Sequence, residues 1–226
     1  MSDSRPLLAP LAVVCLVAIG LLLFLRGSPQ GAPARDAAAD GARYAIAGGG
    51  PQALPPAAPL RFAPQIAASD REVVLRAIGE ARPEARRLVE LVAGLVTVEV
   101  GPSRPGTAGM MTALGDRYLI RLDLGAVHRR LGLRGVRRLV LHELGHVVDA
   151  ALVPTALEQQ LDGATPAGFG CDDGTSGGCA AREERFAESF AKWATGDAGH
   201  DLYIGYRVPP PLSLAGWGQP LVELTR

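Results

Sequence analysis

The spacing of apolar residues along the chain predicts two helices followed by two strands. Residues 69–78 begin with a capping-box sequence, Ser-Asp-Arg-Glu, and continue with apolar side chains at helical spacing. A second helix is expected from Pro83, which suits a first helical turn. β-Branched residues over 95–100 predict a strand, and 118–124 is the best second strand. The segment 101–115 between them contains breakers of regular structure and is expected to be a loop.

Two further helices are expected in the second half of the chain. From 133 to about 152, apolar residues recur with a helical period and without a proline, which indicates a long and largely buried helix. Residues 183–194 form the other helix. Beyond it, 208–211 is rich in proline, and the rest of the C-terminus is expected to be irregular. Helices beside a small sheet place the domain in the α+β class.

The N-terminus carries an apolar segment long enough to cross a bilayer. Residues 7–25 are nineteen uncharged, mostly aliphatic residues between Arg5 and Arg26. We interpret residues 1–26 as a transmembrane anchor and expect the chain to meet the membrane through 7–25. The alternative is a secretory signal that is cleaved off, because Ala-Pro-Ala at 32–34 resembles a cleavage site.

The rest of the chain divides into a linker and one folded domain. Residues 27–59 are rich in proline, alanine and glycine and have no sustained hydrophobic period, which is typical of a disordered or extended linker. Residues 60–226 are expected to form the folded domain. Hydrophobic residues make up 48% of the chain, enough for a core, and a formal net charge of zero argues against a nucleic-acid-binding protein.

Two cysteines bear on where the domain resides. Cys171 and Cys179 flank a glycine-rich stretch, and a pair that closes a short loop in an exported domain favours a disulfide. Two free thiols are the alternative, and a zinc knuckle is disfavoured because the spacing does not fit a Cys-x-x-Cys clamp. The disulfide favours a domain that is membrane-anchored outside the cytoplasm, or secreted if the signal is cleaved.

One short motif in the 133–152 helix carries chemistry. His142, Glu143 and His146 fit H-E-x-x-H, in which the two histidines lie one helical turn apart on the same face and can bind one metal ion. Glu143 is rotated by about 100° from His142, where its carboxylate can take a proton from a metal-activated water. Apolar neighbours indicate a buried helix, and the alternative is a pair of histidines satisfied within an ordinary core.

A zinc site needs a third protein ligand. The metzincin pattern is excluded, because the chain lacks that class's third histidine six residues after the second. In the 183–194 helix, Glu184 and Glu188 share a stripe with two alanines. Small residues would let this helix approach the histidine helix and direct a carboxylate at the metal. The alternative is that both glutamates are solvated charges, paired with Arg185 or Lys192.

These motifs resemble those of the gluzincin peptidases, and among them most closely the catalytic domain of anthrax lethal factor and its relatives. His-Glu-Leu-Gly-His-Val-Val-Asp at 142–149 is similar to that family's H-E-x-G-H-x-x-D, and Glu-Arg-Phe-Ala-Glu-Ser-Phe at 184–190 to its E-x-F-A-E-x-F. The resemblance covers roughly 139–194. It implies that Glu184 binds zinc beside the two histidines, and that Glu188 supports the site without binding the metal. It also implies a zincin-like fold with a small sheet and an active-site helix.

The resemblance further implies a zinc-dependent endopeptidase with one Zn²⁺ ion and a protein or peptide substrate. Glu143 would act as general base for the metal-activated water and then protonate the leaving amine. The family's active-site tyrosine has no counterpart here, since glycines stand in its place, so the candidate stabilisers of the transition state are Tyr203, Tyr206 and His200. The strand 118–124 is expected to hold the substrate backbone by strand addition, as edge strands do in zincins.

The role of Asp149 and the function itself each have an alternative. Asp149 follows His146 by three residues, where it either orients a ligand through a hydrogen bond or is an ordinary surface residue. The loop between Cys171 and Cys179 either forms one wall of the substrate-binding cleft or is only an exposed loop that the disulfide closes. One rival function is a membrane-anchored zinc-binding interaction domain without catalysis, and the other rival is a secreted protein with a chance H-E-x-x-H motif and no metal. Glu143 argues against the first, because a structural zinc site needs no such carboxylate and usually has four protein ligands.

Overall fold

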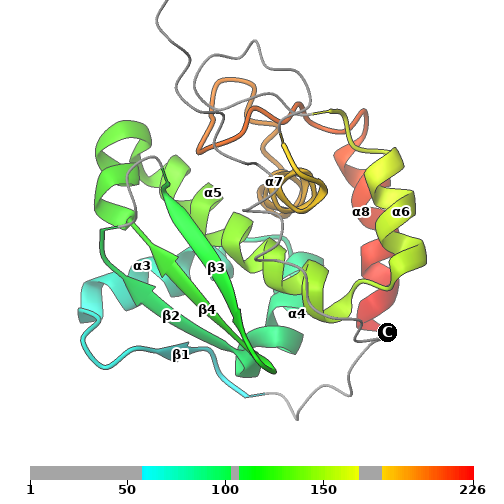
Figure 1. Ribbon diagram of the computed structural model, residues 1–226. Helices are drawn as coiled ribbons and strands as arrows, with labels where there is room; N and C mark the ends of the chain where they lie inside the picture. Colours follow the sequence, from blue (N-terminus) through cyan, green and yellow to red (C-terminus); the bar gives the residue numbers. More distant parts are fainter. Residues whose placement is uncertain (1–57, 103–106, 168–179) are drawn as a thin grey trace, which may run out of the picture. The chain divides into compact units, whose positions relative to one another are not determined.

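Six α-helices and one four-stranded sheet make up the residues that the computed structural model describes, 58–102, 107–167 and 180–226 (Figure 1). In chain order the elements are β1 (Arg61–Phe62), α3 (Ala68–Gly79), α4 (Pro83–Val92), the 3-10 helix η1 (Ala93–Leu95), β2 (Val96–Val100), β3 (Gly109–Leu114), β4 (Arg117–Leu122), α5 (Leu124–Leu152), α6 (Thr155–Gly163), α7 (Arg182–Thr195), α8 (Leu214–Val222) and the 3-10 helix η2 (Glu223–Thr225). This combination confirms the α+β class.

Several expectations concern residues outside the described part of the chain. They are the membrane anchor over 7–25, nearly all of the linker over 27–59, and the pairing of Cys171 with Cys179. Within the described residues, no helix combines the length and the apolar character needed to cross a membrane. The described residues all belong to one compact unit of the chain.

The sheet is mixed, with the strand order β1-β2-β4-β3. β2 pairs in parallel with β1 and β4, and β3 pairs antiparallel with β4 through a turn at Gly115, which has a φ of 65°. β4 therefore lies inside the sheet, so the expectation that 118–124 is the edge strand is wrong. β3 forms an edge of the described sheet, although the sequence predicts a loop over 101–115. Gly109 begins this strand and Gly115 lies in the turn after it, and the strand is stabilised by its pairing along β4.

The two N-terminal helices match the expected segments, but the capping box does not form. α3 begins at Ala68, and its N-cap residue, Ala67, makes no side-chain hydrogen bond to the helix. Ser69 is therefore already helical and lacks the extended backbone that an N-cap serine needs. α4 begins at Pro83, as predicted, and buries Leu88 completely.

The C-terminus is helical, contrary to the expectation of an irregular tail. Ser213 caps α8 by accepting a hydrogen bond at Oγ from a backbone N–H of the first turn, at 3.0 Å. The helix buries Trp217 and Leu221, and Trp217 Nε1 donates to Thr165 Oγ1 at 3.0 Å. Tertiary packing of these two side chains outweighs the poor helix propensity of two glycines and Pro220.

α5 is the long helix predicted around the histidine motif. Asp123 caps its start by accepting a hydrogen bond from the backbone N–H of Ala126 at 2.9 Å. Gly132, with a φ of 64°, interrupts the helix, because this left-handed conformation suits glycine. The uninterrupted part therefore begins at residue 133, where the sequence predicts it.

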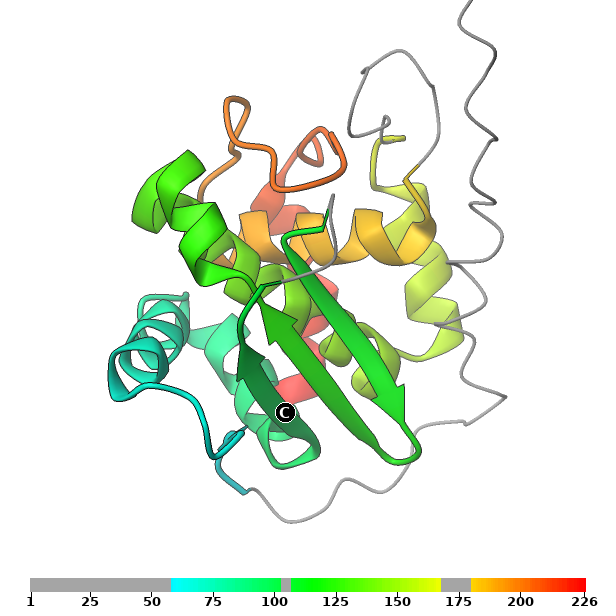
Figure 2. The same ribbon diagram turned by 60° about the vertical axis from the view of Figure 1, so that its left-hand side comes forward.

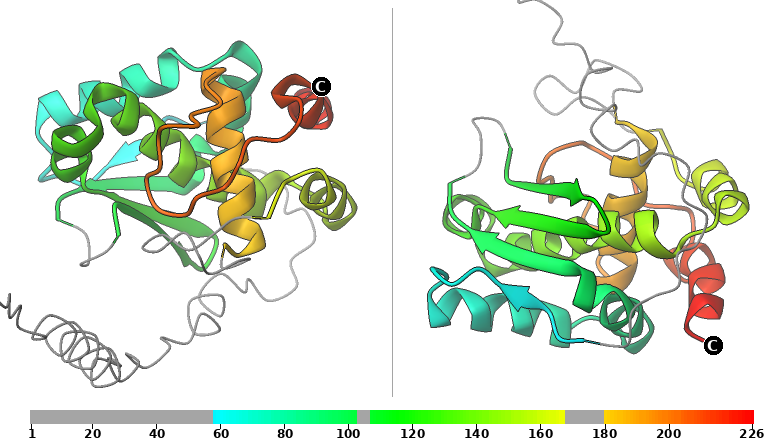
Figure 3. Two further views of the ribbon diagram at one scale, coloured as in Figure 1. Left: turned by 90° about the horizontal axis from the view of Figure 1, so that it is seen from above. Right: turned by 60° about the horizontal axis from the view of Figure 1, so that its bottom comes forward.

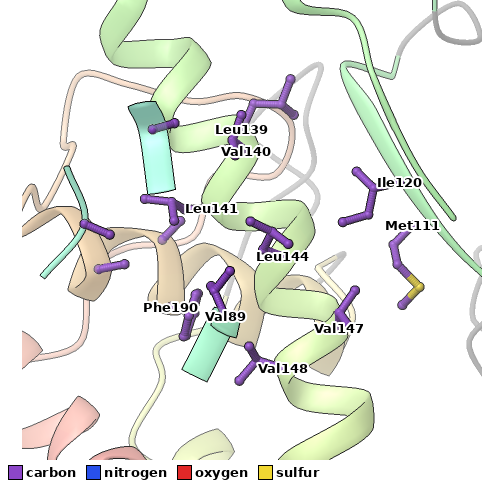
Figure 4. Packing of buried hydrophobic residues seen from close by; sticks show 14 of the residues in the cluster. Val89, Met111, Ile120, Leu139, Val140, Leu141, Leu144, Val147, Val148 and Phe190 are labelled. Carbon is purple, nitrogen blue, oxygen red and sulfur yellow. The ribbon is translucent and has the colours of Figure 1, made fainter. Parts of the chain in front are cut away.

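α5 lies between the sheet and other helices, and it packs on α3, α4 and α7. Met111 and Ile120 of the sheet lie on one side of it, and Val89 of α4 and Phe190 of α7 lie on the other (Figure 4). Figures 2 and 3 show the sheet as one layer with α5 packed along its face. Contacts on both sides explain why most residues between 135 and 149 are buried.

Candidate metal centre

Three side chains from two helices converge on one point. The ring nitrogens of His142 and His146 on α5 and a carboxylate oxygen of Glu184 on α7 lie within 4.8 Å of one another. His142 Nε2 is 3.2 Å from Glu184 Oε2, and His146 Nε2 is 3.7 Å from Glu184 Oε1. These side chains are largely buried, with exposed fractions of 12%, 3% and 18% for His142, His146 and Glu184. This group could hold a metal ion, and it brings together the three ligands that the sequence predicts.

Close packing of α5 on α7 brings these ligands together. The two helices cross steeply, since Figure 1 shows α7 end-on while α5 runs across the view. At the crossing, a Cβ on Gly145 would lie 3.2 Å from Ala187 Cα and 3.1 Å from Phe190 Cδ1. The stripe of small residues predicted for 183–194 therefore faces the histidine helix, and it allows Glu184 to reach both histidines.

Glu188 lies behind His142 and outside the three-ligand group. Its Oε2 is 3.3 Å from His142 Nδ1, and its Oε1 accepts hydrogen bonds from Lys192 Nζ at 2.7 Å and from Arg138 Nη1 at 3.3 Å. The side chains of Glu188, Lys192 and Arg138 are at most 3% exposed. Glu188 is therefore a buried, paired carboxylate and not a solvated surface charge. A carboxylate on the second ring nitrogen is the usual support of a metal-binding imidazole.

Asp149 is buried, with 3% of its surface exposed, so its interpretation as an ordinary surface residue is wrong. Its two oxygens accept hydrogen bonds from Arg182 at 3.0 and 2.7 Å. Burial raises the pKa of Asp149 to about 6, although Arg182 opposes this shift. Arg182 is the first residue of α7, and Asp149 belongs to α5, which also carries His146. The ion pair therefore holds the start of α7, where Glu184 lies, against α5.

Glu143 lies next to the ligands on α5 and faces the start of β3. It is 4% exposed, and within the described part of the chain its Oε2 has no hydrogen-bond partner. A Cβ on Gly109 would collide with Glu143 Oε1 and lie 2.8 Å from Glu143 Cδ. Burial raises the pKa of Glu143 to about 8, partly offset by the charge of His142. A buried carboxyl with one oxygen unpaired within the described residues, beside three groups that could hold a metal ion, is suited to exchanging a proton.

The two histidines differ in protonation. Burial lowers the pKa of His142, but its hydrogen bonds to Glu184 and Glu188 outweigh this effect and raise the pKa to about 10. Burial lowers the pKa of His146 to about 4. Burial also favours the neutral form of Glu184, but the two histidines lower its pKa to about 2. Protonated His142 therefore carries a positive charge beside the negative charges of Glu184 and Glu188. A metal ion bound at this point would have to displace that proton.

The candidate stabilisers of a transition state all lie on the segment that follows α7. His200 is exposed, and Tyr203 is 37% exposed with the Arg207 guanidinium 5.4 Å from its ring centre. Tyr206 is half-buried. Among the described contacts, none joins His200 or Tyr203 to the group of His142, His146 and Glu184.

Two buried cations lie next to the site: the sequence names Lys192 as a possible partner of the two glutamates, whereas the role of Arg138 is not apparent from the motifs. Arg138 precedes His142 by four residues and shares its helix face, while Lys192 follows Glu188 by four residues. An arginine on the buried face of an apolar helix needs an acidic partner, and that signal points to a second carboxylate behind the metal ligands.

No protein-family model, curated protein or solved structure matches the chain.

Proposed function

We propose that this chain is a zinc-dependent endopeptidase of the gluzincin type, with a zincin-like fold and a relationship to the catalytic domain of anthrax lethal factor. The observation that carries the proposal is the convergence of His142, His146 and Glu184 beside a buried Glu143. Glu184 follows His142 by 42 residues in the chain, so local sequence alone does not bring these side chains together. Folding assembles the motifs into one group, which is what a shared function requires.

The donor set fits zinc. Two imidazoles and one carboxylate are a ligand combination of catalytic zinc sites, which keep the fourth position for water or substrate. Calcium and magnesium prefer sites made of oxygen ligands, and structural zinc sites usually have four protein ligands. The contact between Glu188 and His142 Nδ1 also fits, because it leaves Nε2 to the metal.

Glu143 accounts for the proton transfers of peptide hydrolysis. When bound, zinc would supply a Lewis acid that lowers the pKa of water and polarises the scissile carbonyl. The Glu143 carboxylate would accept a proton from the attacking water and then donate it to the leaving amine. Without a metal ion, burial raises the pKa of Glu143 to about 8, and the positive charge of a bound ion would favour its carboxylate form, which is the form that accepts a proton. Its free Oε2 leaves one oxygen available for the water.

β3 is the strand best placed to bind a peptide backbone. It forms an edge of the described sheet, and its first residue, Gly109, lies against Glu143. An extended peptide that adds to this edge would pass beside Glu143 and the three ligands. Main-chain hydrogen bonds to the edge would then hold the scissile bond close to the base, largely independently of the substrate's side chains.

The test is digestion of a peptide library, made from unrelated proteins, by the zinc-loaded full-length chain, with products identified by mass spectrometry. Glu143→Gln keeps the ligands and should retain one zinc ion per chain while cleavage falls by about 10²–10⁴-fold, the usual contribution of a general base. Glu184→Ala removes a ligand and should lose zinc and cleavage together.

The matched control is Glu183→Ala, which removes a carboxylate from the same helix, 33% exposed, and should change neither zinc content nor cleavage. Undiminished cleavage by Glu143→Gln, or zinc retained in full by Glu184→Ala, excludes the proposed mechanism. One zinc ion in the wild type without cleavage of any peptide would favour the non-catalytic zinc-binding domain.

A further inference from the structure

Lys192 is the only lysine among the 23 basic residues of the chain, and it is buried. Its side chain is 1% exposed, and its Nζ donates to Glu188 Oε1 at 2.7 Å and to the backbone oxygen of Val208 at 2.6 Å. Burial of an ammonium group is costly unless it is paired and hydrogen-bonded, as it is here. The compact ammonium fits between these two acceptors, whereas the planar fork of an arginine requires a wider space.

Arg138 brings a second buried cation to the same carboxylate oxygen. Its side chain is 1% exposed, with Nη1 at 3.3 Å from Glu188 Oε1 and Nη2 donating to the backbone oxygen of Asp197 at 2.7 Å. Arg138 belongs to α5, as His142 does, whereas Lys192 belongs to α7, as Glu188 does. The two cations therefore hold Glu188 from both helices that supply the metal ligands.

We propose that Lys192 and Arg138 are positioning residues that act through Glu188 on His142, an inference that rests on the proposed zinc site. Their hydrogen bonds occupy Glu188 Oε1 and leave Oε2 for His142 Nδ1. With Nδ1 held, Nε2 faces Glu184 and the three-ligand group. Removal of a cation leaves Glu188 with less compensation for its buried charge, so the imidazole loses its fixed orientation.

The same two cations connect the metal site to the segment that follows α7. Lys192 holds the backbone at Val208, and Arg138 holds it at Asp197. This segment also carries Tyr203 and Tyr206, which are candidates for contact with the reacting group. The orientation of His142 and the position of this segment are therefore coupled through one buried carboxylate and its two cations.

Zinc affinity of the full-length chain, measured by competition with a chelating dye, tests this inference, together with the visible absorption of Co²⁺ bound in place of zinc. Lys192→Met keeps the length of the side chain and removes its charge. We expect zinc affinity to fall by about tenfold or more and the Co²⁺ spectrum to change, because a ligand is no longer held. Arg138→Met should act in the same direction. In a Glu188→Gln background, Lys192→Met should add little, because its effect is transmitted through that carboxylate.

Arg134→Gln is the matched control. Arg134 holds the same segment, because its Nε donates to Asp197 Oδ2 at 2.6 Å and its Nη1 donates to Asp201 Oδ2 at 2.8 Å. The substitution Arg134→Gln should lower zinc affinity far less than Lys192→Met does. A Lys192→Met protein that folds and binds zinc with unchanged affinity and an unchanged Co²⁺ spectrum overturns the inference, as does an equally large effect of Arg134→Gln.

Two further outcomes are decisive. If Lys192→Met does not fold, Arg138→Met is compared with Arg138→Lys, which retains the charge. Equal zinc affinities for these two variants overturn the inference, and a loss confined to Arg138→Met supports it. A wild-type chain that binds no zinc refutes the zinc site itself. If the wild type binds zinc and Lys192→Met binds it equally well, only the positioning role of Lys192 is refuted.

Discussion

Glu143 occupies space that is open only because residue 109 is a glycine. A methyl group on Gly109 would collide with the Glu143 carboxylate and lie 2.8 Å from Leu139 Cδ1. Both contacted groups are ends of side chains, so Gly109→Ala should lower the free energy of unfolding by only about 1–3 kcal/mol. The displaced base should reduce cleavage on the order of 100-fold, while zinc content is unchanged because no ligand moves. Zinc analysis, peptide cleavage and urea denaturation measure the three effects.

Gly101→Ala is the control for this prediction. It follows β2, and a Cβ at Gly101 would meet nothing within 4 Å. It should leave cleavage and zinc content as they are in the wild type. Full cleavage activity in Gly109→Ala would show that the position of the Glu143 carboxylate is not critical, which contradicts its assignment as the base.

At the scale of single residues, the sequence predicts the three-residue group and, through the family resemblance, Glu188 as its support, but it does not predict the contact of Arg138 with Glu188. The spacing of His142 and His146 fixes their geometry on a helix, and the stripe that contains Glu184 is visible as a pattern. Glu188 and Arg138 are 50 residues apart, and only the packing of α5 on α7 brings them into contact. Such tertiary contacts leave no local signal beyond an unexplained charge on an apolar face.

The separation of α5 and α7 depends on Gly145. A Cβ there would already lie 3.1–3.3 Å from atoms of Phe190 and Ala187. Gly145→Leu should therefore force the helices apart, lower the free energy of unfolding by about 1–3 kcal/mol or more, and weaken zinc binding by moving Glu184 away from the histidines. Denaturation and zinc competition test both effects on one sample.

Gly79→Leu provides the comparison for this prediction, since Gly79 is exposed at the end of α3 and has nothing within 4 Å of its Cβ position. It should change stability little and zinc affinity not at all. If Gly145→Leu is destabilised but binds zinc as tightly as the wild type, the approach of the two helices does not control the ligand geometry.

At the scale of elements, periodicity predicts the helices that bury one face and misses the elements that depend on partners. α4, α7 and the second part of α5 are visible in the sequence because a regular apolar pattern accompanies each of them. The sequence does not predict β3, because glycines lie at its ends and the strand is stabilised by its pairing with β4. α8 was hidden by Pro220 and two glycines, which the packing of Trp217 and Leu221 outweighs.

For the whole molecule, two buried groups should make the stability of the metal-free protein fall as pH rises. The pKa of His142 is raised from 6.5 to about 10, and that of Glu143 from 4.5 to about 8. Between pH 6.5 and 8, each group keeps a proton in the folded state that the unfolded chain releases. The free energy of unfolding should therefore decrease across this window, by at most about 1.4 kcal/mol per pH unit for each such proton. His146, with a pKa lowered from 6.5 to about 4, has the opposite effect, which is largest below pH 6.5 and fades as the pH rises towards 8.

Zinc should remove the part of this slope that belongs to His142, because the ion needs the neutral imidazole and displaces its proton. The difference between the free energies of unfolding with zinc and with a chelator should therefore widen as pH rises from 6.5 to 8. Urea denaturation at several pH values across this window measures both series. His142→Asn lacks the titrating imidazole, so it should flatten the slope of the chelated protein and lose the stabilisation by zinc. A difference that stays constant or narrows in the wild type would contradict the exchange of a His142 proton for the metal, because binding without proton release does not depend on pH in this way.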